Sequence, residues 1–173
     1  MTLHYKTARI ALAAGALLAL SACANLAQVA PGTPLADVQA QFYRPNFECP
    51  QANGDRRVIW TQQPMGQYAW GANVGADGYR VDKVLPLLTD PHFKVLETGT
   101  WSPDRVRCEF GPPARIDEAG LGEKREVVWS YRYKENSVWN SLMYVYMGRD
   151  GSGVTHFHPG PDPMYDEDRF MWR

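Results

Sequence analysis

The amino-acid sequence predicts an α+β protein made of two tandem helix-helix-strand-strand-strand units, with antiparallel sheets and helices on one face. Three observations lead to this fold class. The chain contains an internal repeat, each copy begins with a short amphipathic helix, and each helix is followed by segments with the alternation of half-buried strands. The repeat places the first unit at residues 32–95 and the second at residues 96–160, and it leaves residues 161–173 as a loose C-terminal tail.

The repeat consists of four matched segments that occur in the same order in both copies. The pairs are Gly32-Thr33 with Gly99-Thr100, 37–45 with 105–113, 58–60 with 127–129, and 74–81 with 147–154. The second pair aligns without a gap, and only small insertions separate the others. A single match would carry no weight, but four in one order indicate that one structural unit has been duplicated.

A short helix is predicted at the start of each unit. Thr33 and Ser102 are suitable N-cap residues, and each is followed by a proline, which costs little at the first helical position. In each segment a valine and a phenylalanine four residues apart form one apolar stripe. Prolines at 45 and at 112–113 end these helices.

The remaining elements of each unit are a preceding helix and three strands, and they are clearest in the second unit. Asp90 is a candidate cap for a helix over 91–96. Aromatic residues alternate with other residues over 129–133, which is the period of a strand, and a second strand is predicted over 142–147. Asp150-Gly151 is a hairpin signal that leads into a third strand.

Composition excludes several classes of protein. The 173-residue chain is 45% hydrophobic and 21% charged, with a net charge of −1, so it is too apolar for a disordered protein. The same weak charge excludes a nucleic-acid-binding protein that depends on a strongly basic surface. The length suits one domain, or two small units that share a core.

Residues 1–22 have the pattern of a secretory signal peptide. Lys6 and Arg9 form a basic start, and the apolar run over 10–20 is too short to span a bilayer comfortably. Removal of this segment takes away two of the 18 Lys and Arg and none of the 19 Asp and Glu. The mature chain then has 16 basic and 19 acidic side chains, a net charge of −3.

The signal ends in Leu-Ser-Ala-Cys at residues 20–23, which resembles the lipobox of bacterial lipoproteins. The resemblance implies cleavage before Cys23, attachment of diacylglycerol to its sulfur, and acylation of the new amino group. Three acyl chains would anchor the protein firmly, since each buried methylene contributes about 0.8 kcal/mol. Ala24 after the cysteine implies the outer membrane as the destination, with the protein facing the periplasm, and residues 23–31 form the lipidated start and a short tether.

The motifs that define the repeat resemble those of a known family. Gly-Thr, a valine-containing helix, Phe-x-x-Pro, a tryptophan, and Asp-Gly between strands occur in this order, and Gly111 is the glycine expected before the proline. The pattern, over about residues 25–160, resembles the BamE (SmpA/OmlA) domain of outer-membrane lipoproteins, and the tandem arrangement is similar to the β-lactamase-inhibitor-protein fold. The resemblance implies a non-enzymatic scaffold or accessory factor in the cell envelope, with partners in the assembly of β-barrel outer-membrane proteins.

No catalytic or cofactor-binding motif stands out in the chain. Nucleophile elbows, phosphate-binding loops, zinc-protease helices and dinucleotide fingerprints are missing from the sequence. His156 and His158 would point to the same side of a strand and could form a weak metal site with Asp162 or Asp166, but a polar strand end is the simpler explanation. We therefore expect no enzyme activity, no cofactor and no metal.

Cys49 and Cys108 remain once Cys23 is lipidated, and two interpretations of this pair stay open. In an oxidising periplasm an even number of cysteines invites a disulfide, which would clamp the loop after the first helix to the helix of the second unit. Against this, Cys108 stands where the first repeat has Ala40, an ordinary small helical residue.

Aromatic residues are the best candidates for a binding surface. Trp60 and Trp129 occupy equivalent places in the two repeats and are expected in the core. Tyr68, Trp70 and Trp139 could instead lie on the sheet face that helices leave open, where they would form a concave aromatic surface. Such a surface supports an alternative function, an inhibitor-like module that holds a protein or a ligand.

Overall fold

The computed structural model describes residues 25–165, so the predicted signal peptide and the lipidation site Cys23 lie outside the described residues. The described chain is an α+β protein with two antiparallel four-stranded sheets, and the predicted fold class is confirmed at this level. The strand order is β1-β2-β3-β4 in the first sheet and β5-β6-β7-β8 in the second.

Each half of the chain forms one sheet with helices before it. The first half contains η2 (Leu26–Gln28), α2 (Leu35–Gln41), β1 (Phe47–Pro50), β2 (Arg56–Thr61), β3 (Ala69–Val74) and β4 (Leu85–Pro86). The second half contains α3 (Asp90–Phe93), η3 (Lys94–Glu97), α4 (Pro103–Phe110), β5 (Arg115–Ala119), η4 (Gly122–Lys124), β6 (Glu126–Glu135), β7 (Trp139–Tyr146), β8 (His156–Pro161) and η5 (Pro163–Tyr165).

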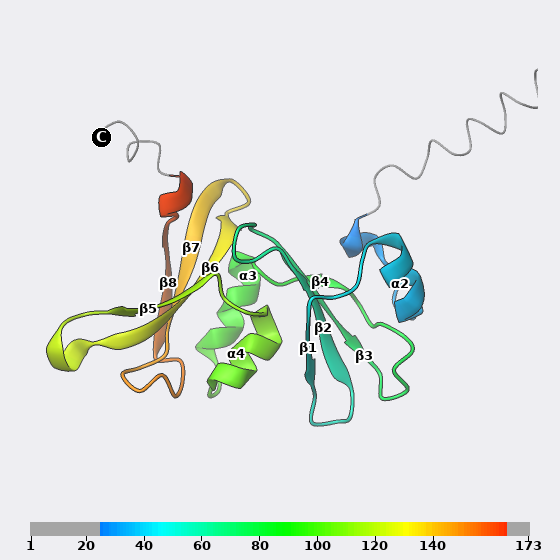
Figure 1. The fold of residues 1–173 in the computed structure, drawn as a ribbon, viewed down its shortest axis with the longest axis horizontal. Coiled ribbons are helices and arrows are strands. Elements are labelled where there is room, and N and C mark those ends of the chain that lie inside the picture. The colour runs from blue at the N-terminus through cyan, green and yellow to red at the C-terminus, as the bar shows by residue number, and fades with distance from the viewer. Residues whose placement is uncertain (1–24, 166–173) are drawn as a thin grey trace, which may run out of the picture.

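The elements form four layers, and helices α3 and α4 lie between the two sheets (Figure 1). Helix α2 covers the outer face of the first sheet. The first sheet is therefore covered by helices on both faces, whereas the prediction placed helices on one face only. The reason is that both faces of β2 are apolar, since Val58 and Trp60 face α2 while Ile59 faces the central helices.

The outer core lies between α2 and the first sheet. Trp60 packs there with Val38 and Val74, and all three side chains are fully buried. The ring N–H of Trp60 donates to the carbonyl of Tyr43 over 2.8 Å, which ties the chain after α2 to the sheet. The expectation that Trp60 is a core residue is confirmed.

The central core is aromatic and is shared by both sheets. The rings of Phe93 and Phe110 stack with centroids 5.0 Å apart, and the ring of Tyr131 from the second sheet lies 5.8 Å from that of Phe110. Trp129 belongs to the same cluster and is 5% exposed, so its predicted place in the core is confirmed. Ile59 from the first sheet joins the cluster from the other side. Because one set of helices serves both sheets, the two halves of the chain share a core.

Each unit has four strands rather than the predicted three. The additional strands, β1 and β5, lie at sheet edges. Strand β5 carries three charged residues and has no buried side chain, so no apolar pattern marks it in the sequence. In the first unit Asp77-Gly78 leads only to isolated bridges at Arg80 and Val81, and the last strand is the two-residue β4.

The helix caps agree with the prediction at α4 and differ elsewhere. Ser102 caps α4 by accepting a hydrogen bond from a backbone N–H of the first turn. Thr33 does not cap α2, because Pro34 takes the N-cap position and makes no side-chain bond there. At α3 the cap is Thr89 rather than Asp90, whose carboxylate instead binds groups of the second sheet.

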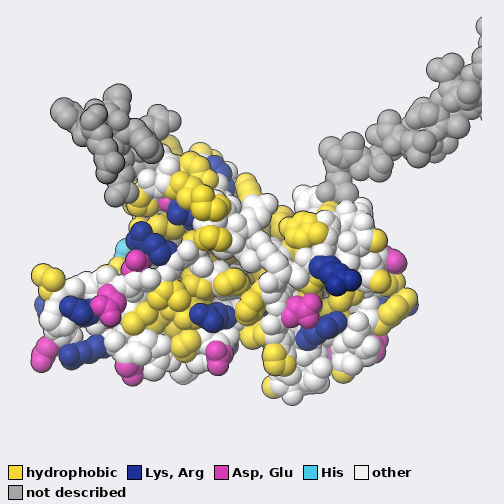
Figure 2. Space-filling model, in the orientation of Figure 1, with side chains coloured by type: hydrophobic (Ala, Val, Ile, Leu, Met, Phe, Trp, Pro, Cys, Tyr) yellow, Lys and Arg dark blue, Asp and Glu magenta, His cyan; other side chains and the backbone are white. Residues whose placement is uncertain are grey.

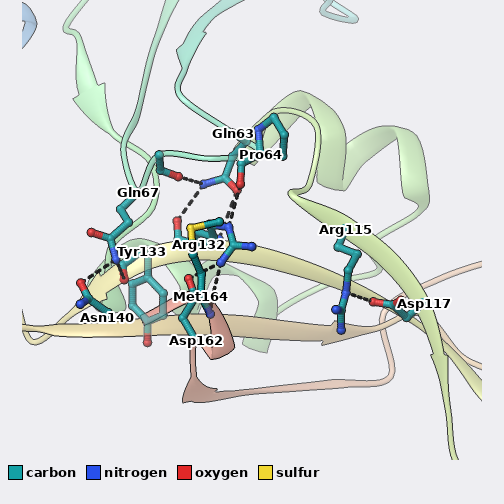
Figure 3. A network of polar contacts seen from close by, with 11 residues as sticks. Gln63, Pro64, Gln67, Arg115, Asp117, Arg132, Tyr133, Asn140, Asp162 and Met164 are labelled. Atoms are coloured by element: carbon teal, nitrogen blue, oxygen red, sulfur yellow. Dashed lines mark hydrogen bonds and ion pairs between the residues drawn. The ribbon is translucent and has the colours of Figure 1, made fainter. Parts of the chain in front are cut away.

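The C-terminal end of the described chain is part of the fold. Pro161 ends β8, and Asp162 is 2% exposed and paired with Arg132, as Figure 3 shows. A buried carboxylate is stable only beside a cation or other donors, and Arg132 supplies that partner for Asp162. This contact holds the segment against the second sheet, so the prediction of a loose tail is wrong for residues 161–165. Residues 166–173 lie outside the described part of the chain.

A disulfide joins the two halves of the chain. The structure pairs Cys49 on β1 with Cys108 on α4, and their Cα atoms lie 5.8 Å apart, which is usual for such a bridge. Of the two interpretations open from the sequence, the structure has the clamp between the first sheet and the helix of the second unit.

A polar cluster lies next to this bridge. Glu109 follows Cys108 in α4, and Arg57 is the register partner of Cys49. Glu109 Oε1 lies 2.7 Å from His92 Nε2 and 3.4 Å from Arg57 NH2. Burial acts to raise the pKa of Glu109, but the His92 ring and the Arg57 guanidinium outweigh it, so the pKa lies below its usual value of 4.5.

Stability is expected to fall in acid as Glu109 becomes protonated. A carboxylate whose pKa is lowered by folding contributes stability above the pKa of the unfolded chain, and this contribution is lost as the pH drops below 4.5 and through the folded-state pKa. In urea unfolding compared at about pH 6 and about pH 3, Glu109→Gln should lose less stability than the wild type. Glu118→Gln, which removes an exposed ion pair with Arg125, should behave like the wild type. Equal acid sensitivity of the wild type and Glu109→Gln would contradict this role.

Candidate functional site

A cavity of about 140 Å³ opens where the first sheet meets the turn between β6 and β7. Its walls come from β3, from the connection between β4 and α3, and from the end of β6, which are far apart in the sequence. The residues that line it are Tyr68, Ala69, Trp70, Pro86, Leu88, Thr89, Lys134 and Ser137. Five of these eight are aromatic or apolar, so the cavity offers mainly apolar contact.

Two glutamines hold the loop before β3 against the second sheet (Figure 3). Tyr68, which follows Gln67 in this loop, lines the cavity. Gln67 Nε2 donates to Asn140 Oδ1 over 2.9 Å, and Gln63 Nε2 donates to the carbonyl of Arg132 over 2.8 Å. The backbone N–H of Arg132 donates in return to Gln63 Oε1 over 3.2 Å. The amide of Gln63 thus satisfies both backbone groups of one β6 residue, as a neighbouring strand would.

The opposite wall, the turn between β6 and β7, is held over the start of α3. Asp90 accepts hydrogen bonds from the backbone N–H of Asn136, at 2.7 Å, and from the hydroxyl of Tyr133, at 3.0 Å. Burial and the Asp90 carboxylate raise the pKa of Tyr133, so this hydroxyl remains a donor. Asn136 and Ser137 have φ angles of 49° and 61°, left-handed conformations that keep the turn tight.

Four apolar or aromatic side chains form what we call the junction surface: Tyr68 and Trp70, which line the cavity, and Val138 and Trp139, which follow the lining residue Ser137 in the chain. The exposed fractions are 48% for Tyr68, 62% for Val138 and 67% for Trp139, whereas Trp70 is half-buried. By strand register, the side chain of Trp139 lies on the same face of the hairpin as Tyr133, whose hydroxyl reaches α3. Figure 2 shows hydrophobic side chains grouped at the turn between β6 and β7.

The structure brings together two of the three predicted binding residues and places the third beside them. Tyr68 and Trp70 line the cavity, and Trp139 follows the turn that forms its other wall. They do not lie on one concave double sheet, because α3 and α4 separate the two sheets (Figure 1). Leu88 and Lys134 were not singled out from the sequence, because neither belongs to a repeat or a binding motif. Only the packing of the first sheet against the turn between β6 and β7 brings them to the cavity.

The chemistry of the cavity is that of apolar packing. Lys134 is the only charged side chain among its described lining residues, and its Nζ already donates to Asn140 Oδ1 over 2.7 Å. Within residues 25–165, no group of three or more His, Cys, Asp or Glu could hold a metal ion. The arrangement can take up an apolar side chain and surround it with aromatic rings.

Comparison of the chain with protein-family models, with curated proteins and with solved structures gives no significant match. The likeness to the BamE domain therefore stays a likeness of motifs. In the part of the chain that the structure describes, no helix has both the length and the apolar character needed to cross a membrane.

Proposed function

We propose that this protein is a lipid-anchored envelope protein that acts without catalysis, by binding a partner protein through the junction surface. The observation that supports this most directly is the exposure of Tyr68, which lines an apolar cavity, and of Trp139, which lies two residues after the lining residue Ser137. Tryptophan and tyrosine are enriched among the residues that dominate binding energy at protein interfaces, above all around a pocket. Exposed apolar surface grouped in this way is typical of an interaction site.

The size of the cavity favours a protein partner over a small molecule. Sites for drug-sized ligands enclose about 300–1,000 Å³, whereas this cavity encloses about 140 Å³. Such a volume suits one apolar side chain of a partner. Trp139 and Tyr68 would then pack beside that side chain and exclude water from the contact.

The anchor and the family resemblance supply the proposed setting. Acylation of Cys23 would hold the folded part, which begins with η2 at Leu26, close to the periplasmic surface of the outer membrane. The likeness to the BamE family supports work as a scaffold or accessory factor in the assembly of β-barrel outer-membrane proteins. Because the tether is short, we expect the partner to belong to that membrane or to be bound to it.

Replacing both Tyr68 and Trp139 by alanine is expected to remove the partner. The tagged lipoprotein would be purified from membranes in mild detergent, and the proteins that accompany it would be quantified by mass spectrometry. We expect β-barrel assembly subunits with the wild type and at least about tenfold lower recovery with the double variant, because Tyr68 lines the cavity and Trp139 is an exposed aromatic residue just after the turn that forms its other wall. Tyr79→Ala is the matched control, since Tyr79 is a similarly exposed aromatic residue (51%) outside the cavity lining.

Cys23→Ala separates anchoring from binding in the same experiment. Loss of the assembly subunits with Cys23→Ala is expected, because the partner and the protein would no longer share a membrane. Recovery of one periplasmic enzyme with both the wild type and Cys23→Ala would instead favour the inhibitor-like alternative. Undiminished recovery with the Tyr68 and Trp139 double variant would refute the role of the junction surface.

A further inference from the structure

The outer face of the second sheet carries no α-helix among the described residues, because α3 and α4 lie against the opposite face (Figure 1). The strand register sets the side chains of this outer face in rows across the sheet. Arg115, Ser130, Tyr144 and His158 form one such row. Arg132 lies two residues further along β6 and therefore shares this face. The face thus combines guanidinium, hydroxyl and aromatic groups, unlike the apolar junction surface.

A hollow of about 310 Å³ lies at the end of this face, where β8 passes into η5, and we call it the sheet-face pocket. Apolar groups of Ala114, Leu142, Pro163 and Met164 make up much of its lining. Arg115, Arg132 and the acidic Asp162 line it too. Its volume reaches the range of small-molecule sites, about 300–1,000 Å³, which the cavity at the junction surface does not.

The two arginines are oriented by partners that leave some of their donors free. Arg132 is bound by the buried carboxylate of Asp162, and its Nε donates to the carbonyl of Pro64 over 2.7 Å, as Figure 3 shows. Arg115 pairs through Nε with Asp117, and its two terminal nitrogens have no hydrogen-bond partner within residues 25–165. The Arg115 side chain is 60% exposed and that of Arg132 is 16% exposed. An anion in the pocket can therefore accept hydrogen bonds from the two terminal nitrogens of Arg115, which face solvent.

Next to Arg115 in the row, a buried hydroxyl lacks a partner. Ser130 is 1% exposed, and its Oγ makes no hydrogen bond among the described residues. An unpaired buried hydroxyl is destabilising until a ligand or a water molecule satisfies it. Burial raises the pKa of Tyr144, the next residue in the row, despite the opposing charge of Arg115, so its hydroxyl is a donor as well. The row thus offers several donors, of which Arg115 lines the pocket itself together with Asp162.

We propose that the sheet-face pocket binds a small apolar carboxylate, an acid whose charged group is carried on a ring or a short hydrocarbon body. The apolar side chains of the lining pack against the ring or hydrocarbon part of the ligand. The two terminal nitrogens of Arg115 donate to the two oxygens of its carboxylate. A carboxylate fits better than a phosphate monoester, because Asp117 and Asp162 stand beside the two arginines. These acidic groups leave little net positive charge, so a dianion would be repelled where a monoanion is tolerated.

The proposal is tested on the full-length lipoprotein in neutral detergent micelles, with methyl NMR as the readout. Phenylacetate is the probe, and 2-phenylethanol, which has the same ring without the charge, is the matched control ligand. We expect phenylacetate to shift the methyl signals of Leu142 and Met164 saturably, with a midpoint on the order of 1 mM. The methyl signals of Leu88, in the other cavity, should not move, which separates binding in the pocket from uptake of the probe by micelles.

Arg115→Gln and Arg125→Gln form a matched pair of variants. Both arginines are exposed, at 60% and 57%, and both pair with an acidic residue, but only Arg115 lines the pocket. Arg115→Gln should raise the midpoint for phenylacetate at least about tenfold, and Arg125→Gln should leave it unchanged. Three outcomes would overturn the proposal: equal shifts with 2-phenylethanol, an unchanged midpoint in Arg115→Gln, or no saturable shift up to about 20 mM phenylacetate.

Discussion

Replacing both Cys49 and Cys108 by serine is expected to lower the free energy of unfolding by about 4 kcal/mol. The bridge spans a sequence separation of 59 residues, and closing a loop of this length removes much of the conformational freedom of the unfolded chain. It also ties the first sheet to α4, the helix that packs against both sheets. Its removal should therefore weaken the contact between the two units as well.

Urea unfolding of the chain exported to the periplasm measures this effect. The reduced wild type should match the double serine variant, because both lack the bond, and Cys49→Ser alone should lose a similar amount. Peptide mapping without reductant should recover the segment around Cys49 joined to the segment around Cys108. Labelling of both thiols in the unreduced protein, or a loss in the double variant below about 1 kcal/mol, would contradict the bridge as a major source of stability.

Truncation of Phe110 to alanine should destabilise the fold by about 3–5 kcal/mol. Phe110 is fully buried in the central core, where its ring lies 5.0 Å from that of Phe93 and 5.8 Å from that of Tyr131. The substitution removes apolar contact and leaves a cavity that the close-packed neighbours can fill only in part. Because α4 lies between the sheets, we expect both sheets to lose stability together.

Amide hydrogen exchange tests both parts of this expectation. Protection should fall by a similar amount in β2 and in β6, which belong to different sheets but pack on the same helices. Tyr79→Ala, at an exposed position, should change the free energy of unfolding by less than about 0.5 kcal/mol. Reduced protection in β6 with unchanged protection in β2 would show that the two units unfold independently.

Local patterns were sufficient for the fold class, for the start of α4 and for the core tryptophans. Ser102 and the proline after it mark the start of α4 through a hydrogen bond within the first turn and a fixed φ, and neither depends on distant residues. Trp60 and Trp129 follow the same duplicated pattern, and each faces the helices of its own unit. Strands β1 and β5 escaped prediction because edge strands, open to solvent along one side, need no apolar alternation.

The two candidate sites depend on contacts that no local pattern contains. Gln63 donates a hydrogen bond to the backbone of Arg132, 69 positions away in the sequence, and Gln67 donates one to Asn140, 73 positions away. These bonds hold the loop that carries Tyr68 at the cavity. Periodicity indicates which side chains share a face of a strand, but not which element packs against that face, because long-range burial decides it. The cysteine pair, the position of α3 and α4 between the sheets, and the pocket beside β5 all arise where one folded unit packs against another segment of the chain.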